Sequence, residues 1–450
     1  MMTTSAHSHA RGLTALGAFA LGFGFALAAA GCGGGGNRAA PAEPCALGGL
    51  AAAPGFAVIA TDYTSTSVGL LDGAARPLAE SWICSGTTAP GLSATLSGDV
   101  VAPTESEPGV LTLLDRNAGV VTRVRYDSGE VVGQVGVQAG AGATAFQPNP
   151  YDMVQVDAQS AWVARFGVNL DPNAAAEDRG NDLVEIDPST MTRTGRRVSF
   201  EAQNGTGTAQ TDDGPVEQTV YARPAAVAKV GGFLVVALVR MSEDFQSSAS
   251  GQVAIVDLSD LSVAAIALSD DGTLRNCQTA APVPGVADEV AVGCTGFDPT
   301  FADEAAVRAS AGIVFVKVDG QTGAASVVER WRPAAGDAIS VVSVTPIDAT
   351  SVVAVDPGVF GESADRLFLL DVVTRAQAIV RNGTSAFSIG QPAYDADAKL
   401  LLVPDADAGA VAGAGAVVVY GGDAAGFTKG ATVQLAADLA LPPRAVYRAN

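Results

Sequence analysis

Short runs of apolar residues that end in aspartate recur along most of the chain. The runs SVGLLD, VLTLLD, DLVEID, QVAIVD, VFVKVD and RLFLLD end at these residues: Asp72, Asp115, Asp187, Asp257, Asp319 and Asp371. A seventh and less regular copy, AVVVYGGD, surrounds Tyr420. Their length and their β-branched residues are typical of buried strands, and helical periodicity is almost absent after Phe56. The pattern therefore predicts a repeated unit of β-strands.

Further predicted strands flank each of these runs. An apolar strand such as FAVIATD or FLVVALV precedes the run, and a turn and a return strand such as SVAAIALSD follow it. Several units add a strand led by proline, at Pro90, Pro150, Pro224 and Pro392. Each aspartate is expected to hydrogen-bond the backbone of the following turn, which is a structural role.

Four antiparallel strands repeated seven times predict an all-β fold, a seven-bladed β-propeller of four-stranded antiparallel blades. Stacking the blades around an axis hides the faces and edges that one blade leaves open. The first unit lacks a proline-led strand, and the segment PRAVYR from Pro443 to Arg448 has no unit of its own. We therefore predict that the ring is closed by the C-terminal strand, placed innermost in the first blade. The competing interpretation is a frayed C-terminal tail.

The repeated units resemble YVTN-type β-propeller repeats, in which a V-x-V-I-D-like strand is followed by a return strand. The resemblance covers residues from about 56 to 450. It implies a fold that serves scaffolds, binding modules and occasional enzymes. The chain departs from this family in its long loops between the second and third strands: ESEPG, NLDPNAAAEDRGND, MSEDFQSSASG, FDPTFADEAAVRASAG and GVFGESADR. Because these loops occupy the same place in their units, we expect all of them on one face, as the candidate working surface.

One of these loops is a candidate calcium site. It carries four carboxylates, Asp171, Glu177, Asp178 and Asp182, and Ca²⁺ prefers several oxygen ligands from a compact loop. No loop has the D-x-[DN]-x-[DN]-G spacing of an EF-hand. A solvated acidic rim is therefore the alternative, and no other cofactor or metal is expected.

The N-terminal residues have the pattern of a secretory signal. Arg11 is the only charged residue before Arg38, and an apolar stretch diluted by Gly and Ala runs from Leu13 to Ala30. The alternative of a retained membrane-spanning anchor fits this diluted stretch less well. Residues 1–31 are therefore assigned as the signal peptide.

The end of this stretch, Ala29-Ala30-Gly31-Cys32, resembles the lipobox of bacterial lipoproteins. The resemblance implies cleavage before Cys32 and attachment of lipid to its thiol. An ordinary signal cleaved after Ala30, with Cys32 left as a free thiol, is the alternative. Residues 32–54 then form a lipid-anchored tether rich in Gly, Ala and Pro, and residues 55–450 form the propeller domain. We expect the protein in the bacterial cell envelope, at the outer membrane, on its periplasmic side or on the cell surface.

The four remaining cysteines, Cys45, Cys84, Cys277 and Cys294, predict two disulfides in an exported chain. Three pairings are possible, and the simplest joins neighbours in sequence, Cys45 to Cys84 and Cys277 to Cys294. The alternative leaves one pair as buried thiols. The absence of a C-x-x-C motif gives no support to a redox or thiolate-metal site.

Charge and histidine content exclude several functions. With 26 Lys and Arg against 47 Asp and Glu, the net charge is −21, which excludes nucleic acid as a partner and limits membrane contact to the lipid anchor. Both histidines, His7 and His9, lie in the signal peptide. The mature protein therefore lacks histidine-based catalysis and histidine metal ligands.

The sequence favours a non-catalytic monomer that acts as a binding or scaffold module for an unknown envelope protein or glycan. Sialidase boxes, P-loops and G-x-S-x-G motifs are absent from the sequence. The alternative is a propeller hydrolase that acts on a glycan or lactone with carboxylate or Ca²⁺ chemistry. Three or more axial carboxylates with perturbed pKa values would favour the enzyme, and small apolar side chains at the axis would favour the scaffold.

Overall fold

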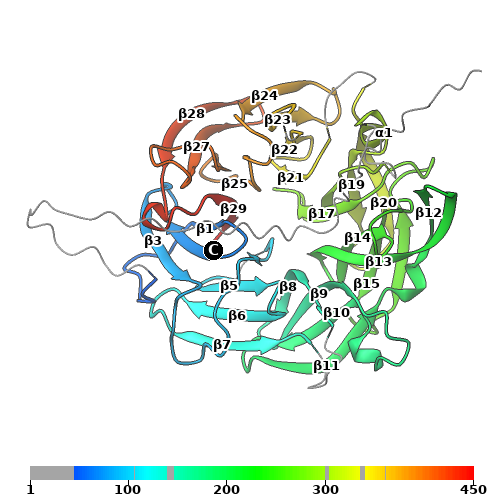
Figure 1. The fold of residues 1–450 in the computed structure, drawn as a ribbon, viewed down its shortest axis with the longest axis horizontal. Coiled ribbons are helices and arrows are strands. Elements are labelled where there is room, and N and C mark those ends of the chain that lie inside the picture. Colours follow the sequence, from blue (N-terminus) through cyan, green and yellow to red (C-terminus); the bar gives the residue numbers. More distant parts are fainter. Residues whose placement is uncertain are drawn as a thin grey trace, which may run out of the picture. The chain divides into compact units, whose positions relative to one another are not determined.

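The computed structural model describes residues 45–449 apart from 106, 139–145, 299–303, 335–339 and 360. In this part of the chain, seven antiparallel sheets surround a common axis as the blades of a β-propeller (Figure 1). The predicted fold class is therefore confirmed. Within the same residues, no helix has the length and apolar character needed to cross a membrane.

Each blade runs outwards from an innermost strand beside the axis, and the strands of the first four blades follow that order. Blade 1 contains β29 (Pro443–Arg448), β1 (Phe56–Thr61), β2 (Thr66–Leu71) and β3 (Pro77–Cys84). Blade 2 contains β4 (Val100–Val101), β5 (Val110–Asp115), β6 (Val120–Arg125) and β7 (Val131–Gly136). Blade 3 contains β8 (Pro150–Asp157), β9 (Ser160–Val168), β10 (Gly180–Asp187) and β11 (Thr192–Ser199). Blade 4 contains β13 (Gly214–Val230), β14 (Phe233–Met241), β15 (Gln252–Asp257) and β16 (Val263–Ala267).

The other three blades follow the same order. Blade 5 contains β17 (Cys277–Pro282), β18 (Glu289–Cys294), β19 (Gly312–Val318) and β20 (Ala325–Trp331). Blade 6 contains β21 (Ser343–Pro346), β22 (Ser351–Asp356), β23 (Arg366–Asp371) and β24 (Gln377–Asn382). Blade 7 contains β25 (Ala393–Asp395), β26 (Leu400–Asp405), β27 (Ala416–Asp423) and β28 (Gly426–Val433). The described helices are short: α1 (Glu304–Ala309) and the 3₁₀ turns η1 (Ala176–Asp178), η2 (Glu201–Gln203) and η3 (Ala437–Leu439).

Burial of a strand follows its place in the blade. All residues of β1 and β2 are buried, whereas the outermost strands β24 and β28 are half-buried or exposed. The apolar faces of successive blades pack together; Trp162 of blade 3, for example, shares one core cluster with Val227 and Val236 of blade 4. Each fully buried Val or Leu side chain contributes about 1.5–3 kcal/mol, so the stacked blades supply most of the stability of the fold.

The aspartates at the strand ends bind the following turns, as predicted. The Oδ1 atom of Asp187 accepts hydrogen bonds from the backbone N–H groups of Ser189 at 2.8 Å and Thr190 at 3.3 Å. Asp371 accepts equivalent bonds from Val373 and Thr374. These side chains satisfy turn donors that would otherwise have only water as a partner.

The C-terminal strand closes the ring, as predicted. Strand β29 pairs antiparallel with β1, with Val446 opposite Val58. On its other edge, Gln391, just before β25 of blade 7, donates its N–H to the carbonyl of Arg444 at 2.9 Å. The last strand therefore connects blades 1 and 7 by main-chain hydrogen bonds.

The predicted assignment of strands in blade 2 is wrong by one position. Residues 90–96 form no strand, and β4 is the innermost strand of this blade. Asp115 therefore ends the second strand rather than the third. The physical reason is local, because Gly91 has a φ of +86° and turns the chain directly after Pro90.

This shift also moves the loop ESEPG to the other face. Successive strands of a blade run in opposite directions, so connections after the second and fourth strands lie on one face and those after the first and third on the other. We call the first of these the loop face. The segment ESEPG joins the first strand, β4, to the second, β5, so it does not belong to the loop face. The four other long loops join second to third strands, as expected.

Blade 4 departs from the four-strand pattern. Strand β12 (Gly205–Thr211) pairs antiparallel with the first part of β13, with Thr208 opposite Glu217. Strand β13 has 17 residues, so its first part extends beyond the blade core as a β-hairpin with β12. The hairpin stands beside the β14–β15 connection on the loop face, because the Ser247 hydroxyl donates to Gln218 at 2.9 Å.

Part of the expected tether packs against the propeller. The carbonyl of Gly48 accepts a hydrogen bond from Trp82 Nε1 at 2.8 Å, and the N–H of Leu50 donates to the carbonyl of Tyr126 at 2.9 Å. Leu47 and Leu50 also contact the core between blades 1 and 2. The segment from Cys45 to residue 54 is therefore part of the packed domain.

Candidate functional site

The innermost strands surround two adjoining cavities at the axis, of about 200 Å³ and 290 Å³. Small and apolar residues from several blades provide much of the first cavity wall: Val101, Ala102, Ala225, Ala226, Ala280, Ala281, Val342 and Val344. Its polar wall is contributed mainly by Arg116, Tyr151, Asp152, Gln278 and Gln391. The axis is therefore a lined channel with one acidic group in its first cavity.

Asp152 is the acidic group of the first cavity, and it is 3% exposed. Its carboxylate accepts backbone N–H bonds from Thr104 at 3.0 Å, Met153 at 2.9 Å and Val227 at 2.9 Å. These donors belong to blades 2, 3 and 4. Burial raises the pKa of Asp152 to about 7, although these hydrogen bonds favour the ionised form. The carboxylate is committed to backbone donors, which leaves it little capacity to bind a substrate.

Glu105 lines the second cavity and also binds an innermost strand. Its Oε1 atom accepts the N–H of Lys229, in β13, at 3.4 Å. Burial raises the pKa of Glu105, and the repulsion between the two carboxylates adds to the raised pKa of Asp152. The axis thus has two carboxylates with raised pKa values among the described residues, below the three that would favour an enzyme.

The four calcium candidates do not form a metal-binding group. Asp182 is fully buried and forms a bidentate ion pair with Arg165, whose Nε and Nη2 atoms each donate to one carboxylate oxygen at 2.7 Å. It forms a further ion pair with Arg197. The Asp171 carboxylate accepts the N–H of Asn173, and Glu177 and Asp178 lie in the 3₁₀ turn η1. Over the described part of the chain, no group of three or more Asp, Glu, His or Cys side chains could hold a metal ion.

Exposed aromatic side chains mark the loop face. Among the described residues these are Tyr63, Phe245 and Phe387, which are 59%, 41% and 46% exposed. Tyr63 follows the second strand of blade 1, Phe245 the second strand of blade 4, and Phe387 the fourth strand of blade 6. All three connections belong to the loop face, which therefore carries aromatic groups on both sides of the axis.

The backbone holds these aromatic residues in an unfavourable conformation. Their φ angles are +67°, +57° and +59°, in the left-handed region that bulky residues rarely adopt. Local bonds hold the turns, since Thr61 Oγ1 accepts the N–H of Tyr63 and Asp365 Oδ1 accepts that of Phe387. An outlier of this kind at an exposed aromatic residue points to a role other than packing.

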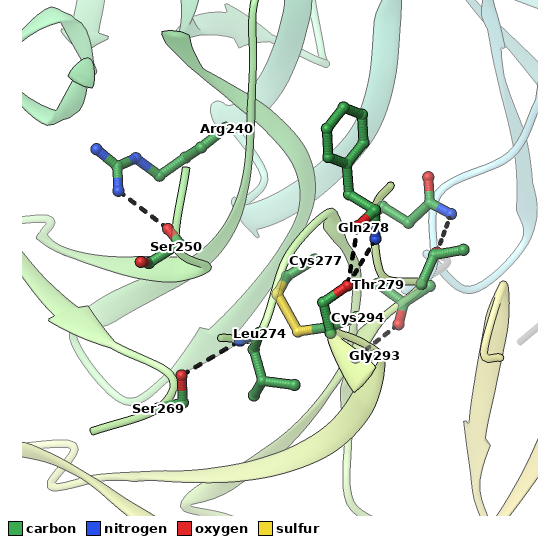
Figure 2. The surroundings of a disulfide bond; sticks show 12 residues. Arg240, Ser250, Ser269, Leu274, Cys277, Gln278, Thr279, Gly293 and Cys294 are labelled. Carbon is green, nitrogen blue, oxygen red and sulfur yellow. Dashed lines mark hydrogen bonds between the residues drawn. A yellow bond between two sulfur atoms is a disulfide. The ribbon is translucent and has the colours of Figure 1, made fainter. Parts of the chain in front are cut away.

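Both predicted disulfides are present with the simplest pairing, Cys45 with Cys84 and Cys277 with Cys294. The first joins the N-terminal segment to the outer strand of blade 1. The second joins the first two strands of blade 5, β17 and β18, where Cys277 and Cys294 are opposite in register (Figure 2). Cys32, the expected lipidation site, lies outside the described residues.

Solved structures of other β-propellers are similar to this chain. Two are putative 6-phosphogluconolactonases, from Bacteroides fragilis NCTC 9343 and Bacteroides uniformis ATCC 8492. The first is 9% identical over 88% of this chain and 97% of that chain, with a TM-score of 0.53. The second is 11% identical over 87% and 98%, with a TM-score of 0.50. Identities this low show a shared fold alone. No protein-family model and no curated protein sequence matches the chain.

The fold and the comparisons thus define a seven-bladed β-propeller protein. The sequence did not single out Asp152, although one signal was present, a lone acid inside the otherwise apolar start of the strand PYDMVQVD. The aromatic residues of the loop face gave no signal, because each is an isolated residue in a polar loop. Their common location depends on the arrangement of blades around the axis.

Proposed function

We propose that this propeller is a non-catalytic binding or scaffold module of the bacterial cell envelope, anchored by lipid on Cys32, that binds a protein or glycan through its loop face. The observation that carries the proposal is the set of exposed aromatic residues, Tyr63, Phe245 and Phe387, on that face. Aromatic side chains are enriched in binding interfaces, where they supply large contact areas with few rotatable bonds. The strands that end in aspartate support placing the repeats among YVTN-type propellers.

The cost of the aromatic conformations supports a binding role. A bulky residue with left-handed φ is disfavoured by about 1–2 kcal/mol, and glycine would avoid that cost. Arginine side chains also lie over two of these rings, since Arg223 Cζ is 5.0 Å from the Phe245 centroid and Arg444 Cζ is 5.8 Å from that of Tyr63. The rings are therefore held in place before a partner arrives, which reduces the entropy lost on binding.

The axial channel supports the non-catalytic assignment. Much of the wall of its first cavity is formed by Ala and Val, and the oxygens of Asp152 are occupied by backbone donors. A glycosidase needs two carboxyl groups free to contact the sugar. Asp152 does not meet that requirement.

A hydrolase is the second candidate, and one observation favours it. The raised pKa values of Asp152 and Glu105 are typical of general acids, which must be protonated near neutral pH. The purified protein should be assayed for lactone opening and for release of reducing sugar from envelope glycans. Activity that is lost in Asp152→Asn and kept in Asp187→Asn would replace the binding proposal with the enzyme.

Site-specific photo-crosslinking in the native envelope tests the binding proposal. A photoreactive amino acid replaces Phe245 on the loop face or, as a matched control, Val373, which is 53% exposed in the β23–β24 turn of the opposite face. The expected result is a crosslinked partner at position 245 and none at position 373. Crosslinks at 373 alone, or at neither position, would contradict the proposal.

A further inference from the structure

A pocket of about 500 Å³ opens on the loop face beside blade 4. The extra strand β12 forms one wall with Thr206 and Thr208, and the β14–β15 connection forms another with Ser248 and Ser250. Two arginines, Arg240 at the end of β14 and Arg275 just before β17, line the rest of the pocket together with Phe297. Hydroxyl-bearing residues thus surround two guanidinium groups.

Both arginines are half-buried and are held by backbone carbonyls. Arg240 donates from Nε to Gln203 at 3.2 Å and from Nη1 to Ser250 at 2.9 Å, as Figure 2 shows for Ser250. Arg275 donates from Nη1 to Ser248 at 2.8 Å. A guanidinium has five N–H donors, so these bonds leave several donors available for a ligand.

No described carboxylate pairs with either arginine. Burial lowers the pKa of Arg240, and repulsion from Arg275 lowers it further. Burial also lowers the pKa of Arg275. Elsewhere in this acidic protein, buried arginines have carboxylate partners, as Arg165 has Asp182 and Arg223 has Glu243. Two desolvated cations of like charge are costly unless an anion compensates them.

The second disulfide holds this pocket in shape. Cys277 follows Arg275 by two residues, and its bond to Cys294 fixes the start of β17 against β18 (Figure 2). The backbone of Arg275 is itself fixed, since its N–H donates to Ser310 at 3.0 Å and its carbonyl accepts from Gly296 at 3.1 Å. Gly205 leaves room on the other side, because a Cβ atom there would lie 2.5 Å from Arg240 Nη2.

From these contacts we infer that Arg240 and Arg275 form a binding site for an oxyanion. The ligand class is a carboxylate, sulfate ester or phosphate ester carried by a hydroxyl-rich molecule such as an acidic saccharide. Guanidinium groups bind such oxyanions through paired hydrogen bonds, and the Thr and Ser residues of the rim can bind neighbouring hydroxyls. The hairpin that enlarges blade 4 thereby has a role, as a wall of the site. The inference rests on the proposed binding function of the loop face and specifies the chemistry of its ligand.

Calorimetry on the purified full-length protein tests this site. The probes are inorganic sulfate, inorganic phosphate, glucuronate and glucose 6-phosphate, with glucose as the uncharged control, at ionic strength matched with NaCl. We expect the anions to bind and Arg275→Gln to weaken binding roughly tenfold or more, because a charge-assisted hydrogen bond is lost. Arg330→Gln, which removes an arginine of β20 in the neighbouring blade 5 that pairs with Asp270, is the matched control and should bind as the wild type does.

A purely structural role for the arginines makes a different prediction. In that case Arg240→Gln lowers the melting temperature and no probe binds the wild type, which would overturn the inference. Under the inference, Arg275→Gln leaves the ligand-free melting temperature unchanged or higher, since it removes a repulsion, and Arg275→Lys restores part of the affinity. Anion binding without a crosslinked partner at position 245 would reject the proposed function alone. A crosslinked partner without anion binding would reject this site alone.

Discussion

At the scale of single residues, aspartate serves two opposite roles in this protein. At exposed turns such as Asp187, hydrogen bonds from the Ser189 hydroxyl and from backbone N–H groups lower the pKa of the carboxyl. At the axis, burial raises the pKa of Asp152 although backbone donors also bind it. Solvent access therefore decides the sign of the shift. The inner strands of a propeller have one unpaired edge. Asp152 binds backbone N–H groups of the inner strands β8 and β13 and of Thr104, just after β4.

The raised pKa of Asp152 predicts a pH dependence of stability. Between about pH 4 and pH 7 the folded state holds a proton on Asp152 that the unfolded state has lost. The contribution of Asp152 to the free energy of unfolding therefore falls as the pH rises through this window. The slope from a single proton is at most about 1.4 kcal/mol per pH unit. Urea unfolding from pH 4 to pH 8 should show that the stability of the wild type relative to Asp152→Asn decreases with pH.

A matched control for this prediction is Asp187→Asn, whose wild-type carboxyl has a lowered pKa. The contribution of the Asp187 carboxyl to stability is present at pH values above its pKa in the unfolded state, and it is lost only as the pH falls below about 4. The difference between wild type and Asp187→Asn should therefore stay constant from pH 5 to pH 8. A constant difference for Asp152→Asn as well would mean that Asp152 is ionised throughout.

The turn aspartates could be predicted and Asp152 could not, because of the distance along the chain to their partners. Asp187 binds N–H groups two and three residues away, so a local pattern contains both donor and acceptor. Asp152 binds Thr104 and Val227, which lie 48 and 75 residues away. Only the stacking of three blades brings these groups together. The same reasoning applies to the arginine pair, whose pocket is formed by four separate segments.

At the scale of elements, the seven blades and their four-stranded pattern could be predicted, but the position of each strand within blade 2 could not. Strand β4 has only two residues before the chain reaches Pro103, which cannot donate to a β-ladder. The longer apolar run from residue 110 to Asp115 resembles a third strand, although the structure places it second. The extra strand β12 was also missed, since GTGTAQT is rich in Gly and Thr and lacks the apolar character of the other strands.

Closure of the ring by β29 predicts that small changes at the C-terminus are costly. Val446 is 1% exposed between blades 1 and 7, so Val446→Asp should lower the free energy of unfolding by roughly 3 kcal/mol or more. Arg448→Gln on the same strand removes a partly exposed ion pair with Asp395 and should change the free energy of unfolding by less than about 1 kcal/mol. Chemical unfolding measures both values.

Deletion of residues from Pro443 onward extends this test. The truncated protein should melt at a sharply lower temperature, and protease should cleave blade 1 first, because β1 loses its pairing edge. Equal melting temperatures of the truncated and full-length proteins would show that β29 adds nothing to closure.

At the scale of the whole molecule, the acidic propeller and its disulfides are consistent with export. Both disulfides lie within single blades or their adjoining segments, so each can form before the ring is complete. An oxidising compartment is where such bonds persist. The proposed lipid on Cys32 would hold the propeller at a membrane through the segment that ends at Cys45.

The proposed lipid anchor predicts the behaviour of Cys32→Ala in cell fractionation. The wild type should fractionate with membranes and its intact mass should include acyl chains, whereas the variant should leave the membrane fraction, because the lipid supplies its hydrophobic attachment. Cys45→Ala with Cys84→Ala is the control, since it removes cysteines without removing the lipid site. An unlipidated wild-type mass, together with a variant that stays with membranes, would reject the anchor.

The pairing of β29 with β1 also constrains the order in which the protein can fold. Strand β1 is made early, but its inner partner is β29, so blade 1 stays incomplete until residues 443–448 have been made. A ring that cannot close before this segment is made stays incompletely folded for longer, and a chain in that state is suited to threading through a membrane pore. If the chain is exported as proposed, the position of this one strand delays folding until the chain has crossed the membrane, where its cysteines can oxidise.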